Sequence, residues 1–401
     1  MLEVDLHPLF TPFRLRHLTL RNRFVLPGMQ RGQAINGMPR DAMISFLRER
    51  AEGGCALITS EGTGLDHPTS FWQPIFCRLA EDTANVWERS IEAVKGAGSH
   101  ILMQLWHPGA MRRGFPTGSP AAQIQSLSPS GLVQAGYENG KAMDAQDLED
   151  TKGAFVRAAE LAKRLGADGV EVHAAHGYLL DEFLWSETNL REDEYGGKTL
   201  AQRARYPAEV VASIRAATGN DFVISFRFSQ FKEIDLKARL TDDLSELSDF
   251  LAVIRSAGAD CFHVSTRRFD KPEWPDRGNR GLAGWVKSMT DAAVTTVGSV
   301  GLDTDTFTDL NENHDPQLQI ERDLERLVTR MKHGEFDLVS VGRAQIANSD
   351  FVEKIRQRRF EDVVCFRKAV HLKEFFENFD HKAVTTSDHR KEEKSIADVS
   401  S

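Results

Sequence analysis

Residues 169–197 read GVEVHAAHGYLLDEFLWSETNLREDEYGG, an apolar strand pattern that runs directly into two histidines and a tyrosine. Val170 and Val172 have the β-branched side chains that are typical of a buried strand. His173, His176 and Tyr178 follow at the point where that strand gives way to a loop. Parallel α/β folds place their chemistry at the carboxyl ends of their strands. The stretch therefore predicts a parallel sheet with a candidate site at one edge.

The same alternation of strand and helix patterns recurs along the whole chain. We predict strands at residues 24–29, 56–60, 100–106, 169–173, 222–228, 261–265, 295–300 and 338–341. Helical patterns lie between them, such as those at 41–52, 86–96, 147–165, 204–217, 242–257 and 321–333. Eight strands alternating with helices predict an α/β fold, a single (β/α)₈ TIM barrel. The alternative is a doubly wound open sheet, which would not need eight equivalent units.

The chain of 401 residues shows no sign of a second domain. We expect one barrel domain over residues 1–380 and a polar, disordered tail over 381–401. Long connections at 112–145 and 266–284 are expected to carry substrate contacts. The pattern DVVCFRKAVHLKEFFENF at 362–379 predicts a helical segment that closes the barrel.

Composition excludes several classes of protein. The net charge of -9 offers no global basic surface, so we expect no nucleic-acid partner. Cys55, Cys77, Cys261 and Cys365 form no C-x-x-C pair, which argues against an iron–sulfur cluster or a zinc ribbon and favours a reducing compartment. Neither a secretory signal nor an apolar run of membrane-spanning length is present, so we expect a cytoplasmic protein without a membrane partner.

Polar residues at the predicted strand ends indicate a phosphorylated ligand with a polar ring. Strands seven and eight end in glycine, and Arg343 follows the second of these glycines, which is the usual phosphate site of a barrel. Gln104 and Arg227 add an amide and a cation in the middle of the mouth, suited to a polar heteroaromatic ring. A phosphorylated cofactor with such a ring would be FMN.

The chain resembles the Old Yellow Enzyme family of FMN-dependent ene-reductases along nearly its whole length. The resemblance runs from HPLFTPFRLRHLTLRNRFVLPGM near the start to DLVSVGRAQIANSDF near residue 351, and it is most specific at HAAHGYLLDEFLWSETNLREDEYGG. The segments QLWHPG, SFRFS and VGR occur in the expected order. It implies an FMN reduced by NADH or NADPH and reoxidised by an activated alkene, a small-molecule acceptor, in ping-pong fashion.

The resemblance also implies roles for individual residues. Flavin ring and ribityl contacts would come from Pro27, Met29, Gly62, Gln104 and Arg227, and phosphate contacts from Gly301, Gly342 and Arg343. His173 and His176 would donate hydrogen bonds to the carbonyl oxygen of the acceptor, as an oxyanion hole does. Tyr178, a phenol that stays protonated at neutral pH, would protonate the carbon next to the carbonyl after hydride transfer from the flavin.

Four departures from the family pattern stand out. Gln30 replaces the usual Cys or Thr, a position that the resemblance places against the flavin and that tunes its redox potential. Glu182 replaces a usual Gln, and Trp185-Ser186 a common Ser-Pro. The connection at 303–319 is longer than usual, and we expect it to alter the mouth or an oligomer contact.

Other readings remain open at this point. Two histidines three residues apart can bind zinc, but no third ligand stands at a convincing spacing, so we expect no metal. They can also be buried structural residues. A flavin-dependent dehydrogenase or demethylase on the same barrel is a second enzyme reading, and a non-redox barrel that binds a phosphorylated ligand is a third. The natural acceptor, the choice of nicotinamide and any homo-oligomer are left open.

Overall fold

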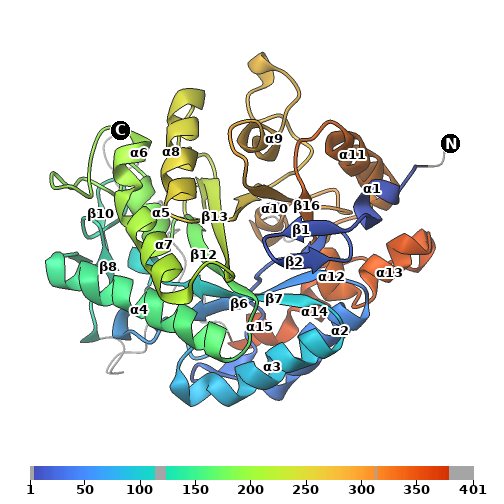
Figure 1. Ribbon diagram of the computed structural model, residues 1–401, viewed down its shortest axis with the longest axis horizontal. Coiled ribbons are helices and arrows are strands. Elements are labelled where there is room, and N and C mark those ends of the chain that lie inside the picture. The colour runs from blue at the N-terminus through green and yellow to red at the C-terminus, as the bar shows by residue number, and fades with distance from the viewer. Residues whose placement is uncertain (1–3, 113–122, 312–313, 379–401) are drawn as a thin grey trace, which may run out of the picture.

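Eight parallel strands form a closed barrel within the residues that the structure describes (Figure 1). The structure is a computed structural model that describes residues 4–112, 123–311 and 314–378. The barrel strands are β3 (Phe24–Leu26), β6 (Leu57–Gly64), β7 (His100–Trp106), β12 (Gly169–His176), β13 (Val223–Lys232), β14 (Cys261–Ser265), β15 (Ala293–Val297) and β16 (Leu338–Ser340). Each strand pairs with the next, and β16 pairs with β3 to close the ring. The predicted (β/α)₈ barrel is confirmed, and the open-sheet alternative is wrong.

Helices cover the outside of the barrel (Figure 1). The helices that connect successive strands are α2 (Asp41–Glu52), α3 (Ala84–Gly96), α4 (Ala145–Arg164), α7 (Arg205–Thr218), α8 (Leu244–Ser256), α9 (Leu282–Lys287) and α11 (Ile320–Lys332). Shorter helices are α1 (His7–Phe10), α5 (Leu179–Leu184), α6 (Leu200–Arg203), α10 (Thr306–Asn311), α12 (Arg343–Ala347) and α13 (Phe351–Arg356). In the connection after β7 lie the short strands β8 (Leu127–Ser128), β9 (Leu132–Gln134), β10 (Tyr137–Glu138) and β11 (Lys141–Ala142). A small hairpin of β4 (Ala34–Ile35) and β5 (Met38–Pro39) follows β3.

The predicted elements are recovered with shifted ends. Strands β6, β12 and β13 run three to four residues further than predicted. Most of the added residues are polar or glycine, which is typical of loops, but polar side chains such as His176 and Lys232 find partners in the barrel mouth and the backbone stays in the ladder. Conversely, β3, β15 and β16 end earlier than predicted. The expected loop at 266–284 contains the start of helix α9, which sequence periodicity missed because the helix is only six residues long.

The segment at 362–379 corrects one expectation. It forms two short helices, α14 (Lys368–His371) and α15 (Lys373–Asn378), instead of one, and the barrel is closed by the β16–β3 pairing. The two helices lie at the mouth, where Lys368 and Phe375 line a cavity. The expected tail at 381–401 lies outside the described residues.

Close packing between β12 and β13 explains why β12 begins with glycine. A β-carbon at Gly169 would lie 2.3 Å from the carbonyl oxygen of Val223, well inside van der Waals contact. The two strands pair in parallel over most of their length, and every residue of both is buried. Strands of a parallel barrel are covered on both faces, which is why even their polar side chains are buried here.

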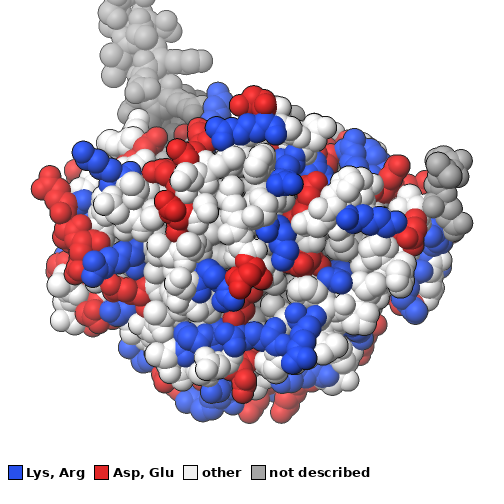
Figure 2. Space-filling model, turned by 45° about the horizontal axis from the view of Figure 1, so that its top comes forward, with Lys and Arg blue, Asp and Glu red and all other residues white. Residues whose placement is uncertain are grey.

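Basic and acidic side chains are interspersed on the face of the molecule drawn in Figure 2.

None of the helices in the described ranges is both long and apolar enough to cross a lipid bilayer.

A hairpin of β1 (Phe13–Leu15) and β2 (Leu18–Leu20) plugs the amino-terminal end of the barrel. Its leucines form one buried cluster with inward-facing residues of the barrel strands, among them Leu57, Leu102 and Leu338. Leu20 is fully buried in this cluster. The hairpin therefore supplies the bottom layer of the barrel interior, which must be filled for the ring of strands to be stable.

We expect Leu20→Ala to lower the free energy of unfolding by about 2–5 kcal/mol, because it removes buried methyl groups and leaves a cavity. Urea denaturation followed by circular dichroism measures the change. Leu190→Ala is the matched control, since the Leu190 side chain is 61% exposed. Equal stability of the two variants would show that the hairpin does not contribute to the barrel core.

Candidate functional site

One cavity at the carboxyl ends of the strands brings together nearly all the residues singled out from the sequence. Its walls include the catalytic candidates His173, His176 and Tyr178, and the cofactor candidates Pro27, Met29, Gly62, Gln104, Arg227, Gly342 and Arg343. His176 and Arg343, at opposite ends of the predicted site, thus lie in the same cavity. Gln30 lines it as well.

Gly301 is the predicted site residue that does not line this cavity. Its N–H donates to Asp323 Oδ2 at 2.8 Å, and its carbonyl oxygen accepts from the N–H of Gln319 at 2.9 Å. Both backbone groups are thereby used within the protein. Gly298 and Ser299, which precede Gly301 in the same connection, line the cavity instead.

His173, His176 and Tyr178 form a compact aromatic cluster. The His173 ring lies 5.1 Å from the rings of both His176 and Tyr178, centre to centre and nearly perpendicular to each. The backbone N–H of Ala175 donates to His173 Nδ1 at 3.3 Å, so the neutral ring carries its proton on Nε2. His176 Nε2 lies 2.8 Å from the hydroxyl of Ser265.

Burial determines the protonation of this cluster. It lowers the pKa of both His173 and His176 well below the ordinary value, and the positive charge of Arg227 lowers each further. Burial, followed by the negative charge of Glu233, raises the pKa of Tyr178 well above 10. At neutral pH the cluster therefore consists of two neutral imidazoles and a protonated phenol, all able to donate one hydrogen bond. In the described ranges no three His, Cys, Asp or Glu side chains are grouped as a metal ion would require.

A left-handed turn directs these side chains. His176 and Gly177 have φ angles of 68° and 87°, which end β12 and lead the chain into α5 with Tyr178 at its start. The N–H of Gly177 donates to Asp181 Oδ2 at 2.7 Å. Lys232 Nζ lies 2.7 Å from the other oxygen of Asp181, and both side chains are fully buried. The strained turn is thus held by a buried ion pair that joins α5 to the end of β13.

A polar layer lies beneath the cavity floor, at the centre of the barrel. Glu171, two residues before His173 on the inward face of β12, accepts from Gln104 Nε2 at 2.8 Å and from the Ser225 hydroxyl at 3.0 Å. His263 Nδ1 lies 2.8 Å from Glu171 Oε2, the oxygen that also accepts from Ser225. Four strands are joined through this carboxylate, which orients the Gln104 amide. Sequence reasoning missed Glu171 and His263, although period-two alternation with His173 and Ser265 places both on inward-facing positions.

The floor of the cavity fits a polar ring. Arg227 is buried, and within the described part of the chain no carboxylate lies within 4.0 Å of it and its Nε has no partner. Among the residues that the structure describes, the guanidinium donates to the carbonyl oxygen of Gly28 and to the hydroxyl of Ser265. Gln30 Nε2 donates to the carbonyl of Gly62 at 2.8 Å, and its Oε1 finds no partner in the described part of the chain. Arg227 Nε and Gln30 Oε1 thus have no hydrogen-bond partner among the described residues, and a heterocycle with donors and acceptors would satisfy both.

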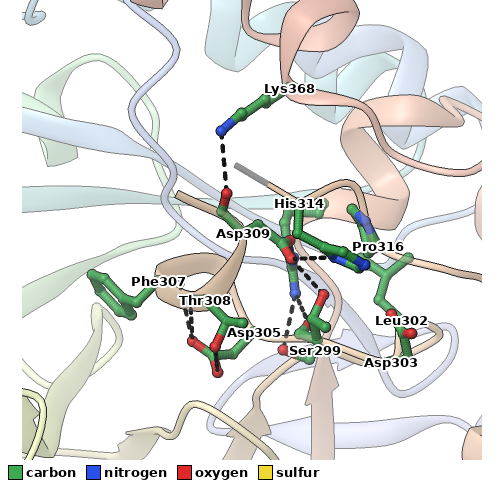
Figure 3. A network of polar contacts seen from close by, with 12 residues as sticks. Ser299, Leu302, Asp303, Asp305, Phe307, Thr308, Asp309, His314, Pro316 and Lys368 are labelled. Atoms are coloured by element: carbon green, nitrogen blue, oxygen red, sulfur yellow. Dashed lines mark hydrogen bonds and ion pairs between the residues drawn. The ribbon is translucent and has the colours of Figure 1, made fainter. Parts of the chain in front are cut away.

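The other end of the cavity gathers cations around the start of α12. Arg343 is buried and contacts the carboxylate of Asp309, and it donates to the Ser299 hydroxyl at 2.9 Å. Figure 3 shows Lys368 reaching the same place from the C-terminal segment, where Nζ donates to the carbonyl of Asp309 at 3.1 Å. Asp309 lies on α10, inside the connection at 303–319 that the sequence marks as long. This connection therefore shapes the mouth, and it brings a carboxylate against the predicted phosphate-binding arginine.

Aromatic side chains form the third wall. Trp106 lies against Tyr178 with ring centres 5.3 Å apart, and Phe76 packs between Trp106 and Phe375 of α15. Helix α15 is held over the mouth by Glu374, which accepts from Arg40 at 2.7 Å. A small molecule bound in this part of the cavity would lie against aromatic rings. The sequence alone did not predict this wall, because its aromatic residues lie far apart in the chain.

Comparison with known proteins places this geometry in a wider context. Residues 8–325 match the profile of the NADH:flavin oxidoreductase / NADH oxidase family. An NADH oxidase from Thermoanaerobacter brockii is 30% identical over 88% of this chain, although the chain spans only 52% of that protein. The 12-oxophytodienoate reductase 7 of Oryza sativa subsp. japonica is 28% identical over 87% of this chain and 88% of its own length.

A solved structure shares the fold. The Old Yellow Enzyme homologue from Zymomonas mobilis superposes with a TM-score of 0.72 at 23% identity, covering 94% of this chain and 98% of that one. This likeness concerns the barrel and its connections rather than any particular chemistry.

We expect Lys232→Met to lower the free energy of unfolding by about 3–5 kcal/mol, because it leaves the buried carboxylate of Asp181 without its partner. The double variant Lys232→Met/Asp181→Asn should recover part of the loss, since it buries no unpaired charge. Urea denaturation of the single and double variants measures both. A single variant as stable as the original protein would mean that the pair does not hold the turn.

Proposed function

Because the chain belongs to the NADH:flavin oxidoreductase / NADH oxidase family, whose members are FMN-dependent oxidoreductases, we propose that it is an ene-reductase that uses NADH or NADPH to reduce an activated alkene. The relative named as a 12-oxophytodienoate reductase supports a carbonyl-bearing acceptor. The observation that carries the proposal is the convergence in one cavity of two neutral imidazoles, a phenol and Arg227, which has no carboxylate within 4.0 Å among the described residues.

The residues present fit FMN. Arg227, Gln104 and Gln30 would hold the ring, since the first and last have buried polar atoms without protein partners. A β-carbon at Gly62 would lie 3.1 Å from both amides, so glycine keeps the space beside them open. Arg343, Lys368 and the backbone at Gly298 and Gly342 would hold the phosphate. When bound, FMN takes a hydride from the nicotinamide and passes it to the acceptor.

The histidines would bind the carbonyl oxygen of the acceptor. Negative charge develops on that oxygen as the alkene is reduced, and preorganised donors stabilise it. His173 supports this role best, because the Ala175 N–H occupies its Nδ1 and leaves the Nε2 proton to be donated. His176 is held by Ser265 and by stacking on Phe231 at 5.2 Å between ring centres. Losing one such donor typically costs about 10²–10³ in rate.

Tyr178 would supply the proton to the carbon next to the carbonyl. Its phenol stays protonated at neutral pH because burial raises its pKa. Trp106 and Trp72 surround the ring and exclude water from it, so protonation would come from this one group. The phenol lies within the same cavity as the imidazole pair, as a bifunctional acceptor requires.

We expect the purified protein to be yellow and Tyr178→Phe to separate the two half-reactions. Flavin reduction by NADPH should stay within about threefold of the original rate, while reoxidation by 2-cyclohexen-1-one should fall by about 10²–10⁴, the usual contribution of a general acid. Anaerobic stopped-flow absorbance follows both. Equal slowing of the two half-reactions would contradict the acid role, and a colourless protein that binds no added FMN would refute the proposed function as a whole.

We also expect Asp309→Asn to tighten FMN binding, because the Asp309 carboxylate competes with the phosphate for Arg343 and repels it. The dissociation constant should fall at least about tenfold, a difference of about 1.4 kcal/mol. Quenching of flavin fluorescence on binding to the apoprotein measures it.

Riboflavin is the matched control for this variant, since it lacks the phosphate. Its affinity should stay the same in the original protein and in Asp309→Asn. Weaker FMN binding in the variant would mean instead that Asp309 holds Arg343 in place for the phosphate.

A further inference from the structure

Glu233 stands directly behind the proposed acid. It follows the last residue of β13 and lines the same cavity as Tyr178. Its Oε2 lies 3.1 Å from the Tyr178 hydroxyl, and its Oε1 lies 3.7 Å from His176 Nδ1. The backbone N–H of Glu233 donates to the carbonyl of His176 at 3.0 Å. Backbone and side chain together therefore fix this carboxyl group against the two residues that would handle the acceptor.

The surroundings of Glu233 leave it without a permanent counter-ion. The titratable groups that face Glu233 are Tyr178 and His176, and Arg227 lies earlier on β13. Lys232, its neighbour in sequence, is engaged by Asp181. Among the residues that the structure describes, no Lys or Arg lies within 4.0 Å of the Glu233 carboxyl group. Burial raises the pKa of this group to about 7, and the Tyr178 hydrogen bond and Arg227 lower it only in part.

We propose that Glu233 sets the acidity of Tyr178: as a carboxylic acid it donates its O–H to the phenolate oxygen as that oxygen loses its proton, and as a carboxylate it prevents the loss. This inference rests on the proposed function and names the residue that regulates its proton donor. Glu233 acts through Tyr178, so it is a positioning residue and not a catalytic one.

The proton balance of the step is simple. The Tyr178 O–H bond breaks as the new C–H bond of the product forms, and the electron pair stays on the phenolate oxygen. A protonated Glu233 lies 3.1 Å away and stabilises that charge by a charge-assisted hydrogen bond. An ionised Glu233 would place a second negative charge at the same distance, which opposes formation of the phenolate. Solvent then restores the phenol, and the Glu233 side chain is 32% exposed, so it provides a path for that proton.

The direction of the pH dependence follows from the pKa. Below about pH 7 Glu233 is protonated and Tyr178 can act as the acid, and above about pH 7 Glu233 ionises and proton donation slows. Alkene reduction by the pre-reduced enzyme should therefore fall as the pH rises through this value. Flavin reduction by NADPH does not use the phenol, so Glu233 imposes no such fall on it.

The test is the variant Glu233→Gln, whose amide N–H can donate to the phenolate but cannot ionise. Pre-reduced enzyme is mixed anaerobically with 2-cyclohexen-1-one across about pH 5.5–9, a range that spans the titration of Glu233. We expect the original enzyme to lose at least about tenfold in reoxidation rate across the upper half of this range, and the variant to stay within about threefold throughout. At the highest pH the variant should be the faster enzyme.

Two controls separate this role from a structural one. Glu273→Gln replaces another glutamate whose pKa is raised by burial, but one that pairs with Arg239 outside the cavity. The reoxidation rate of this variant should still fall as the pH rises, as in the original enzyme. Difference infrared spectra should show a protonated carboxyl band in the original enzyme that disappears at high pH and is missing in Glu233→Gln at every pH.

A wrong role for Glu233 and a wrong proposed function give different results. A reoxidation rate that falls over the same pH range in Glu233→Gln as in the original enzyme overturns the role of Glu233. So does a variant that reduces no alkene at any pH while its flavin is still reduced by NADPH. If the original enzyme itself reduces no 2-cyclohexen-1-one, the proposed function fails first, whatever the infrared spectra show for Glu233.

Discussion

Pairing between β16 and β3 closes the barrel, and the site depends on that closure. The two strands meet through Val339 with Phe24 and Ser340 with Val25, residues more than 300 positions apart in the chain. Closure makes all eight strands point their carboxyl ends at a single mouth. Residues that follow β3, residues of β12 and β13, and the start of α12 thereby line one cavity, although nothing in their local sequence brings them together.

Charges in this barrel divide into those that hold the structure and those left for chemistry. Lys232 and Asp181 are fully buried and paired, and they hold the turn that presents His176 and Tyr178. Arg31 and Glu61 are also buried and paired, with Arg31 Nε 2.7 Å from Glu61 Oε1. Arg227 and Glu233 face the cavity without such partners in the described part of the chain. Because an unpaired buried charge is costly, Arg227 in this cavity indicates a ligand, and the partly exposed Glu233 is placed to exchange a proton.

Segments outside the barrel repeat give the cavity its individual character. The connection at 303–319 contributes α10 and brings Asp309 to Arg343, while the C-terminal segment contributes Lys368 and the aromatic cover of Phe375. Neither segment belongs to the strand–helix repeat. A common barrel can thus be combined with a particular cavity, because connections at the mouth vary without disturbing the core.

The amino-acid sequence alone determined the class of fold and much of the site. Strand patterns ending in His173, His176, Tyr178 and Gly342-Arg343 predicted a barrel with a flavin-type mouth, because β-branched runs and strand-end polar residues are local signals. The tertiary structure decided what depends on distant contacts. Gly301 gives its N–H to Asp323 instead of the cavity, Asp309 meets Arg343, and Glu233 contacts Tyr178 across 55 positions of the chain. Such contacts leave no periodic trace in a sequence, since they form only when closure of the ring brings separate loops to one place.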